Sequence, residues 1–434
     1  MKVAIAGYGL EGRASVDYWY SRGDEVTVLD ENSNLERVPD GVSCVLGPQA
    51  FQSLSEYDLV VRTASLRPDR LQGAKQVWSA TNEFFTKCPT SIIGVTGTKG
   101  KGTTCSLIAS ILRAADKTVH LVGNIGTPAL EVLPIIKSTD IVVFELSSFQ
   151  LWDIKKSPHI AVVLMIEPDH QDVHTDMDEY VGAKSNIRSN QVIGDVCFYH
   201  PTNQLSNQVA FTSTATPPRR YGVAEDGACY VKEDKFFIQD IEICNTKELH
   251  LVGQHNIENA CAAISATWEY TREPEVFKKG INDFKGLPHR LKLVKEIQGV
   301  RYFDDSIATT PGSAIAAIKS FSEPKILILG GYDKGADYTE LINLCRTTNT
   351  RVVTMGQTGE YIANLCKEVS VQVREAHESG MPEVVNITSS WAEPGDVVIL
   401  SPASASFGMF KNYVDRGEQF IEQVNQLARE LSMQ

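Results

Sequence analysis

The stretch Gly97-Thr98-Lys99-Gly100-Lys101-Gly102-Thr103-Thr104 carries the strongest structural signal in the chain. It follows a predicted buried strand over residues 91–96 and opens a predicted helix over residues 103–115. A glycine-rich loop between a strand and a helix is typical of phosphate-binding loops, whose backbone amides cradle a polyphosphate. We therefore predict a nucleoside triphosphate site, in which the Lys101 ammonium balances charge on the outer phosphates and a hydroxyl just beyond it holds Mg²⁺. A flexible surface loop rich in Gly and Lys is the alternative.

The spacing of this loop departs from the pattern G-x-x-x-x-G-K-[ST]. Gly102 stands where that pattern has a hydroxyl, and Thr103 follows it. The sequence therefore leaves open whether Thr103 or Thr104 meets the metal.

Strand-like apolar runs alternate with helical stretches on both sides of the loop, which is typical of parallel α/β layers. Further strands are expected at residues 2–6, 25–29, 59–61, 141–144, 160–166, 325–329, 351–355 and 396–400, and helices up to residue 22 and over 256–271 and 407–431. Short alternating runs over residues 192–251 predict a local antiparallel sheet. We predict three α/β domains: a Rossmann-like domain over 1–90, a central P-loop ATPase-like domain with a small antiparallel sheet over 91–290, and a Rossmann-like domain over 291–434.

Length and composition agree with a multidomain globular enzyme. At about 150 residues per domain, 434 residues suggest two to three domains. The net charge of −13 disfavours binding to nucleic acid or to anionic membranes in general. The longest apolar run, residues 160–166, is too short to span a bilayer, and the first ten residues are predicted to form a buried strand instead of a signal peptide. Nine cysteines without a C-x-x-C pair favour reduced thiols and the cytoplasm.

A second glycine-rich turn, Gly7-Tyr8-Gly9-Leu10-Glu11-Gly12, fits the pattern G-x-G-x-x-G between a strand and a helix. Asp30 ends the next expected strand, as in dinucleotide-binding folds. By itself the turn suggests a dinucleotide dehydrogenase. A tight turn without a ligand is the alternative, and a nucleotide-type ligand without redox chemistry is as compatible with the turn as a dinucleotide.

Several charged residues follow expected strands near the phosphate loop. Asp169-His170-Gln171-Asp172-Val173-His174 could form the metal site of a hydrolase or a set of hydrogen-bonding caps on a loop. Glu145 ends the strand at 141–144, where a Walker-B-like carboxylate would face the nucleotide crevice. Lys184 lies on a predicted helix, where a solvated surface lysine is the default.

Two polar turns follow strands in the last third of the chain, Asp304-Asp305-Ser306 and Gly330-Gly331-Tyr332-Asp333-Lys334-Gly335. Such turns serve as ordinary connections or as ligand loops, and the residues alone do not decide between them.

Together and in this order, the motifs resemble those of the Mur ligases, the ATP-dependent amide-forming enzymes of peptidoglycan precursor synthesis, and above all the MurD type, which joins D-glutamate to UDP-N-acetylmuramoyl-L-alanine. The resemblance covers nearly the whole chain. Two blocks are especially specific for this type, Ser147-Ser148-Phe149-Gln150 and Ser401-Pro402-Ala403-Ser404-Ala405-Ser406. The other matching segments are 97–101, 123–126, 145–151, 169–170, 180–184, 255–256 with 259, 287–290, 305–310, 330–335 and 407 with 410–412.

The resemblance implies roles for the matching residues. The implied catalytic residues are Lys101, Glu145, His170 and Lys184. Two Mg²⁺ ions are also implied. Thr103 and Glu145 would bind the first ion, and His170 and Lys184 would bind the second. Lys184 matches a lysine that is carbamylated in Mur ligases, which turns a cation into an anion. The implied ATP contacts are Gly97, Thr98, Lys99, Gly100, Lys101, Gly102, Thr103, Thr104, Asn256, Asn259, Arg290 and Asp305. The implied UDP-substrate contacts are Leu10, Glu11, Asp30, Ser65, Asn124 and Ser147, and the implied glutamate contacts are Thr309, Lys334, Ser406, Phe407 and Tyr413.

The implied reaction is consistent with the residues. A carboxylate is a poor acceptor for an amine, so ATP must first convert it to an acyl phosphate, and Mg²⁺ and Lys101 would screen the repulsion between the two anions. No serine or cysteine nucleophile is required. The resemblance further implies a cytoplasmic monomer with no nucleic-acid partner and no membrane insertion, and D-glutamate preference rests on the resemblance alone.

Some residues depart from the family pattern. The loop Thr63-Ala64-Ser65-Leu66-Arg67-Pro68 differs from the usual Ser-Pro-Gly form on the UDP side, and Ile307 replaces a lysine that some members have. Residues 99–103 also resemble folylpolyglutamate synthase, which is the alternative glutamate ligase. From other classes, a nicotinamide-dependent oxidoreductase would leave the phosphate loop unexplained, and a non-catalytic nucleotide-binding regulator would not need Lys101, Glu145 and His170.

Overall fold

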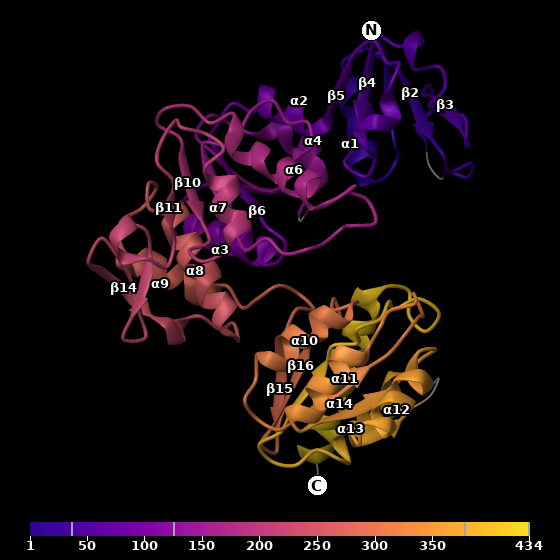
Figure 1. The fold of residues 1–434 in the computed structure, drawn as a ribbon, viewed down its shortest axis with the longest axis vertical. Coiled ribbons are helices and arrows are strands. Elements are labelled where there is room, and N and C mark those ends of the chain that lie inside the picture. The colour runs from indigo at the N-terminus through magenta and orange to yellow at the C-terminus, as the bar shows by residue number, and fades with distance from the viewer. Residues whose placement is uncertain (36–37, 125, 377–378, 433–434) are drawn as a thin grey trace. The chain divides into compact units, whose positions relative to one another are not determined.

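The computed structural model of the protein describes residues 1–35, 38–124, 126–376 and 379–432 (Figure 1), so that Ile125 of the family motif at 123–126 lies outside the described residues. Its first sheet is parallel, with strand order β3-β2-β1-β4-β5. The elements of this part are β1 (Lys2–Ala6), α1 (Leu10–Ser21), β2 (Glu25–Asp30), β3 (Ser43–Leu46), β4 (Leu59–Arg62), β5 (Val77–Ser79) and α2 (Ala80–Lys87). Residues 3–6 of the central strand are buried, as expected for a parallel strand covered on both faces.

The strand order reverses at β1, since β2 lies on one side of it and β4 on the other. The loops that follow β1 and β4 therefore diverge at the carboxyl edge of the sheet, where open α/β sheets bind their ligands. Thr63, directly after β4, donates its hydroxyl to the carbonyl of Ala6 at 2.8 Å. Gly7 has φ of 92°, and a Cβ there would lie 2.3 Å from Thr63 Oγ1, so this position requires glycine.

The second sheet is also parallel, with order β11-β10-β9-β6-β8-β7. Its elements are β6 (Ile92–Thr96), α3 (Lys101–Ala114), β7 (Val119–Gly123), α4 (Ala129–Val132), β8 (Ile141–Glu145), α5 (Ser148–Leu151), β9 (Ile160–Val163), α6 (Met177–Ser189), β10 (Val196–Tyr199), α7 (Gln204–Ala210) and β11 (Arg219–Arg220). Two further helices follow, α8 (Gln254–Thr267) and α9 (Pro274–Asp283). The strand that precedes the glycine-rich loop, β6, is central and buried along its length.

The prediction of an antiparallel sheet throughout residues 192–251 is wrong in its first half. β10 pairs in parallel with β9 and is followed by the helix α7, because its four apolar residues are buried on both faces of the main sheet. The antiparallel sheet consists of β12 (Tyr230–Lys232), β13 (Lys235–Ile238) and β14 (Ile241–Asn245). Glu233 and Asp234 join the first two strands with φ of 49° and 56°, as a two-residue hairpin turn requires.

The third sheet has the order β15-β16-β20-β17-β18-β19, in which only the edge strand β15 runs antiparallel to its neighbour. Its elements are β15 (Lys292–Ile297), β16 (Val300–Asp304), α10 (Pro311–Lys319), β17 (Lys325–Leu329), α11 (Thr339–Thr347), β18 (Thr350–Thr354), α12 (Gly359–Glu368), β19 (Val373–Glu375), α13 (Met381–Ser389), β20 (Val397–Leu400) and α14 (Tyr413–Ser432). The predicted α/β class is thus confirmed in each of the three main sheets.

The expected helix over residues 407–431 begins later than predicted. Gly408 adopts φ of 87°, which an α-helix does not allow, and Asn412 then caps the helix by accepting the Asp415 amide at 2.9 Å. α14 therefore starts at Tyr413 and leaves residues 407–412 in a loop.

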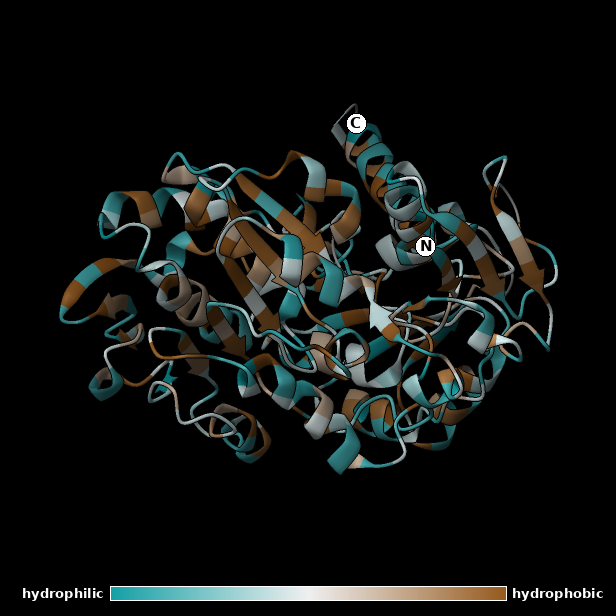
Figure 2. Ribbon diagram, turned by 90° about the horizontal axis from the view of Figure 1, so that it is seen from above, coloured by the Kyte–Doolittle hydropathy of each residue, from teal (hydrophilic) through white to brown (hydrophobic). Residues whose placement is uncertain are grey.

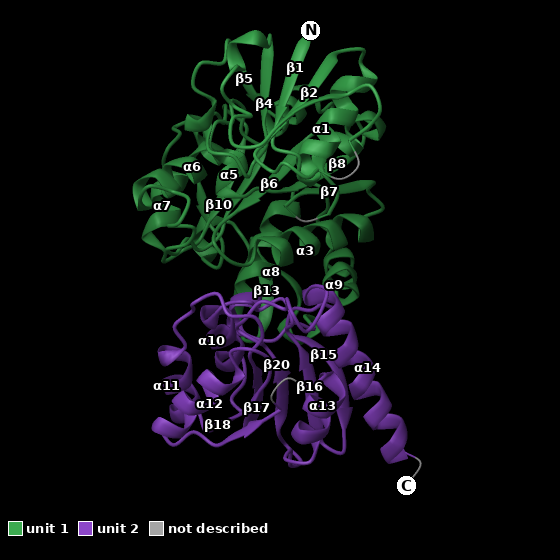
Figure 3. Cartoon of the chain, turned by 90° about the vertical axis from the view of Figure 1, so that its right-hand side faces the viewer, with its two compact units in different colours: residues 1–249, 257–284 green, residues 250–256, 285–434 purple. Residues whose placement is uncertain are grey.

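The chain divides into two compact units, residues 1–249 with 257–284 and residues 250–256 with 285–434 (Figure 3). The first two main sheets lie in one unit and the third lies in the other, while the domain boundaries near residues 90 and 290 stay predictions. Many strands are brown in Figure 2, the hydrophobic end of its scale, in keeping with buried parallel sheets. Among the described helices, none is long and apolar enough to cross a membrane.

Candidate active site

The glycine-rich loop between β6 and α3 has the geometry of a phosphate-binding loop. Gly100 adopts φ of 86°, and a Cβ there would lie 2.6 Å from Asn259 Oδ1. Lys101 is the first residue of α3, and its ammonium donates to the carbonyls of Gly97 at 3.1 Å and Thr98 at 2.8 Å. The helix start provides unpaired amides and the positive end of the helix dipole, so the loop can bind an anion.

The hydroxyls beyond Lys101 differ in their surroundings. Thr103 and Thr104 are both buried, and Thr104 Oγ1 donates to Asn259 Oδ1 at 3.3 Å. The structure thus brings Asn259 of α8 to the loop, as the resemblance implied. Lys99 is exposed instead, and its ammonium lies 3.2 Å from Glu167 Oε2.

Glu145 ends β8, which pairs with β6 so that Glu145 lies opposite Val95, two residues before the loop. Its side chain is 5% exposed, and Asn124 donates its amide to Oε1 at 3.3 Å. A buried carboxylate at this edge suits a hard cation with oxygen ligands. Asn124, implied as a UDP-substrate contact, and Glu145, implied as a Mg²⁺ ligand, therefore lie in contact.

Lys184 is not a surface lysine. It projects from α6, is 1% exposed, and its ammonium donates to the Gly97 carbonyl at 2.9 Å. The ring of Tyr180 lies 4.7 Å away, and the Tyr180 hydroxyl contacts Thr98 Oγ1 at 3.0 Å. Burial, followed by the charge of Lys101, holds the pKa of Lys184 well below its usual range.

The two histidines of the 169–174 segment differ in their burial and in their contacts. His170 is exposed, with its ring 4.8 Å from that of Phe149 and Nε2 3.6 Å from Asp169 Oδ2. His174 is buried, its Nε2 contacts Ser148 Oγ at 3.0 Å, and burial lowers its pKa. In the part of the chain that the structure describes, no three His, Cys, Asp or Glu side chains are grouped around a possible metal position. His174 is thus a packed, hydrogen-bonded side chain.

Four residues of the implied UDP-substrate set lie at the carboxyl edge of the first sheet: Leu10, Glu11, Asp30 and Ser65. A cavity of about 400 Å³ is lined by Tyr8, Gly9, Arg13, Asp30, Asn32, Asn34 and Leu35. Asp30 lies at its wall and accepts the Tyr8 amide at 2.7 Å, while Leu10 is 76% exposed. Glu11 accepts the Ala64 amide at 2.6 Å, next to the exposed Ser65. Ser147 belongs to the other sheet, where it caps α5.

In the second unit, the buried Asp305 is held by two donors. Its carboxylate accepts the Ser401 hydroxyl at 2.7 Å and the Leu291 amide at 3.1 Å. Burial raises the pKa of Asp305 to about 7, against the opposing effect of these bonds and of Arg290. Asn256, also buried, donates its amide to the Val252 carbonyl at 2.7 Å.

Part of the implied glutamate set comes together. The Lys334 ammonium lies 5.7 Å from the centre of the Phe407 ring, and the ring of Tyr332 lies 6.2 Å from the same ring. Ser406 is buried directly before Phe407. Tyr413 starts α14 and accepts the Ser306 hydroxyl at 2.7 Å through its carbonyl, while Thr309 is exposed in the loop before α10.

Three buried arginines were not foreseen from the sequence: Arg62 at the end of β4, Arg188 in α6 and Arg416 in α14. Arg416 donates to the Ser306 hydroxyl at 3.0 Å and to the Ser404 carbonyl at 3.0 Å, so it joins two of the loops named above. Burial lowers its pKa to about 10. A signal was present: Arg416, Phe420 and Val424 recur every four residues and so share one face of the helix.

Comparisons with known proteins agree with this geometry. Residues 95–267 match the model of the Mur ligase middle domain, and residues 289–404 match that of the Mur ligase, glutamate ligase domain. A UDP-N-acetylmuramoylalanine–D-glutamate ligase of Clostridium tetani is 37% identical over 96% of this chain and 95% of its own length. A ligase of the same name from Acetivibrio thermocellus is 36% identical over 98% of this chain and 96% of its own.

Solved structures share the fold at low sequence identity. MurF from Acinetobacter baumannii superimposes with a TM-score of 0.64 at 16% identity, covering 98% of this chain and 90% of its own. UDP-N-acetylmuramate–alanine ligase MurC from Thermotoga maritima has a TM-score of 0.62 at 16% identity, covering 98% and 100%. FolC of E. coli, solved with ADP, has a TM-score of 0.57 at 17% identity, covering 81% and 92%.

The raised pKa of Asp305 predicts a pH dependence of stability. Because its folded pKa of about 7 lies above its ordinary value of 3.8, the contribution of the protonated carboxyl is full below about pH 3.8 and is lost as pH rises through about 7. The ligand-free wild type should lose at most about 4 kcal/mol of unfolding free energy over this window. Asp305→Asn should flatten that loss in denaturant unfolding at about pH 5 and about pH 8.

The matched control is Asp337→Asn in the same unit. The pKa of Asp337 is lowered by hydrogen bonds from Thr339, so its stabilisation is present above about pH 3.8 and does not change over the window used. Equal slopes for wild type and Asp305→Asn would contradict the assignment.

Proposed function

The chain belongs to the Mur ligase family, and from this membership we propose that it is an ATP-dependent, ADP-forming ligase that joins D-glutamate to UDP-N-acetylmuramoyl-L-alanine in peptidoglycan precursor synthesis. The observation that carries the proposal is the convergence of Lys101, Lys184 and Glu145 around the phosphate-binding loop. The names of the relatives, matched over nearly the whole chain, supply the substrates. They do not favour the folate ligase, the oxidoreductase or the regulator.

The chemistry requires two anions to meet. The acceptor carboxylate attacks the γ-phosphorus of ATP, ADP leaves, and an acyl phosphate forms. Lys101 stands where it can balance the charge that develops on the transferred phosphoryl group, and the amides at the start of α3 hold the remaining phosphates. The amine of D-glutamate then attacks the acyl carbon, a proton leaves the nitrogen, and phosphate departs from the tetrahedral intermediate.

Mg²⁺ fits the donors at the loop. Thr103 and Glu145 would hold one ion, since a hydroxyl oxygen and a buried carboxylate at the loop suit a hard cation, and Thr104 offers the alternative hydroxyl. His170 and a carbamylated Lys184 would hold a second. Bound Mg²⁺ would lower the repulsion between the carboxylate and the phosphates.

The remaining assignments are part of the same proposal. The cavity beside Asp30 would take the UDP group, and Asn256, Arg290 and Asp305 would contact the nucleotide. The enzyme would act as a cytoplasmic monomer, which agrees with nine free cysteines and a net charge of −13.

Acceptor-dependent phosphate release tests the function. Purified protein with ATP and Mg²⁺ should release ADP and phosphate only when both UDP-N-acetylmuramoyl-L-alanine and D-glutamate are present. Lys101→Ala should stay folded and lose about 10² to 10⁴ in rate, because the reacting phosphates lose a balancing charge. Formation of AMP and pyrophosphate, turnover without an acceptor, or L-glutamate preferred over D-glutamate would contradict the proposal.

Lys184 should be carbamylated. Its lowered pKa leaves a neutral amine, which can attack CO₂ to give a carbamate and release a proton. With ¹³C-labelled bicarbonate, wild type should show a carbamate carbon in its NMR spectrum that Lys184→Ala lacks. Lys184→Ala should be severely impaired, and added short carboxylates should restore part of the activity.

Lys325→Met is the control for this experiment. Lys325 is also buried, and burial lowers its pKa as well, but it lies within β17. The carbamate signal should persist in Lys325→Met. A signal lost in both variants, or a fully active Lys184→Ala without added anion, would refute the carbamate at Lys184.

The glutamate site should depend on Lys334. Glutamate brings two carboxylates, and a charge-assisted bond to one of them is worth about 1.5–3 kcal/mol. Lys334→Met should therefore raise the KM for D-glutamate by about tenfold or more and change that for ATP little. Lys319→Met, an exposed lysine of α10, serves as control, and equal effects on both KM values would assign the loop to the nucleotide.

A further inference from the structure

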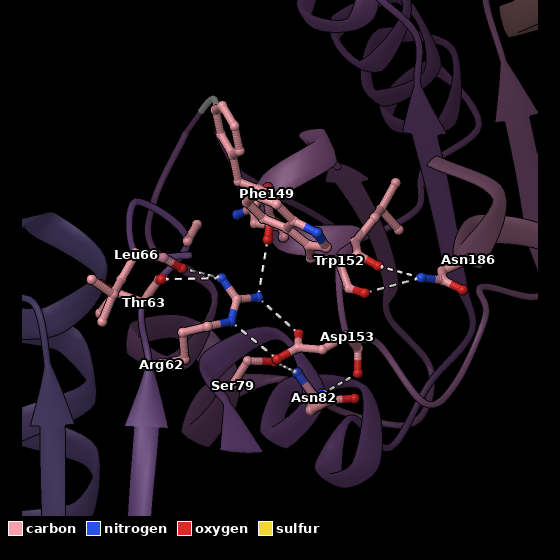
Figure 4. Close-up of polar contacts among 12 residues, drawn as sticks. Arg62, Thr63, Leu66, Ser79, Asn82, Phe149, Trp152, Asp153 and Asn186 are labelled. Carbon is pink, nitrogen blue, oxygen red and sulfur yellow. Dashed lines mark hydrogen bonds and ion pairs between the residues drawn. The ribbon is translucent and has the colours of Figure 1, made fainter. Parts of the chain in front are cut away.

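Arg62, the last residue of β4, is a buried arginine whose donors are all used (Figure 4). Its side chain is 1% exposed. Nε and Nη2 donate to the two carboxylate oxygens of Asp153 at 3.0 and 2.8 Å, and Nη2 also donates to the Phe149 carbonyl at 3.0 Å. Nη1 donates to the carbonyls of Thr63 at 3.2 Å and Leu66 at 3.0 Å. The five N–H groups of a guanidinium thus each have an acceptor.

These acceptors belong to two segments that are distant in sequence. Thr63 and Leu66 belong to the loop after β4 of the first sheet, and residues 149–153 comprise the end of α5, the short helix after β8 of the second sheet, and the turn that follows it. We call the contact between the loop after β4 and residues 149–153 the junction. Asn82 of α2 strengthens the junction, since its side chain donates to the Asp153 carbonyl at 3.0 Å and accepts the Lys155 amide at 2.7 Å. Arg62 is the ionic centre of this junction.

The junction continues to the helix of Lys184. Asn186, two residues further along α6, donates its side-chain amide to the carbonyls of Leu151 at 2.9 Å and Trp152 at 3.2 Å. The turn at 149–153 is therefore bound on one side to Arg62 and on the other to α6 (Figure 4). Residues 149–153 therefore connect the first sheet with α6, the helix that carries Lys184.

The loop after β4 is held from its other side as well. Glu11, in α1, accepts the Ala64 amide at 2.6 Å, while Arg62 donates to the carbonyls of Thr63 and Leu66. Burial raises the pKa of Glu11, and the charge of Arg62 opposes that rise, so the two ionic side chains support each other. The backbone of residues 63–66 is thus fixed by the Arg62 guanidinium, which binds two of its carbonyls, and by the Glu11 carboxylate, which binds one of its amides.

Residues 63–66 contain no proline that would restrict their backbone, so the contacts above are what hold its conformation. We propose that Arg62 is a positioning residue that fixes loop 63–66 and joins it to the 149–153 turn, so that the UDP-linked acceptor is held in register with the phosphate-binding loop. The role of the loop in acceptor binding rests on the proposed function. Arg62 itself touches no reacting atom.

Arg62→Lys and Asp153→Asn test this role. Lysine keeps the charge but cannot bond both segments as a planar fork, and asparagine keeps the shape of Asp153 but removes its charge. Either change should raise the KM for UDP-N-acetylmuramoyl-L-alanine by about tenfold or more, with the KM values for ATP and D-glutamate changed by less than about threefold. In the ligand-free protein, hydrogen exchange should become faster in residues 63–66 and 149–155 and stay unchanged in the strands of the second sheet.

The controls are Arg220→Lys and Asp226→Asn. These residues form a two-bonded ion pair of the same geometry, at 2.9 Å for both contacts, but it lies within one short segment at the surface. Both control variants should keep all three KM values and the exchange of residues 63–66 and 149–155.

The outcomes separate the two proposals. If wild type releases no phosphate with the acceptor, the proposed function fails, whereas the exchange data still test the junction. Positioning is overturned if both variants keep the wild-type acceptor KM, if all three KM values rise equally, or if exchange increases throughout the first unit.

Discussion

Two lysine side chains share one carbonyl oxygen at the start of the phosphate-binding loop, and the arrangement of the candidate site depends on that contact. Lys101 and Lys184 both donate to the Gly97 carbonyl, at 3.1 and 2.9 Å. Two ammonium groups at one oxygen repel each other, and burial together with the charge of Lys101 lowers the pKa of Lys184. The contact thus leaves Lys184 poised to become neutral.

Buried arginines play a comparable part in both units. Arg62 uses its whole guanidinium to hold two loops of the first unit, and Arg416 binds the loops that contain Ser306 and Ser404 in the second. Loop carbonyls at the carboxyl edge of a parallel sheet have no strand partners, so they need another donor if the loop is to keep one conformation. A guanidinium supplies several donors from a single side chain, which makes it effective where loops must be fixed without adding secondary structure.

The parts of the fold that could be predicted were those that a single local sequence pattern determines. β17 has the predicted bounds because five consecutive residues are buried on both faces and a polar turn follows them. The later start of α14 depends on the left-handed backbone of Gly408. The placement of β10 depends on the strand with which it pairs. The local pattern of apolar residues predicts neither feature. At the site, the positions of Glu145 and Lys101 followed from strand ends and helix starts. The burial of the Lys184 and His174 side chains could not be predicted from the sequence, because it depends on how α6 packs against its neighbours.

The absent hydroxyl at Gly102 shows how one departure is absorbed by its neighbours. Consecutive residues of a helix point about 100° apart, so a hydroxyl moved by one position approaches a metal from another side of α3. Thr104 donates its hydroxyl proton to Asn259 and so ties α3 to α8, while the lone pairs of the same oxygen stay available to a metal. Thr103 is buried in the first turn of α3, so a hydroxyl stands at each of the two positions after Gly102. The loop therefore keeps hydroxyl oxygens directly beyond Lys101, although the usual position of the hydroxyl is a glycine.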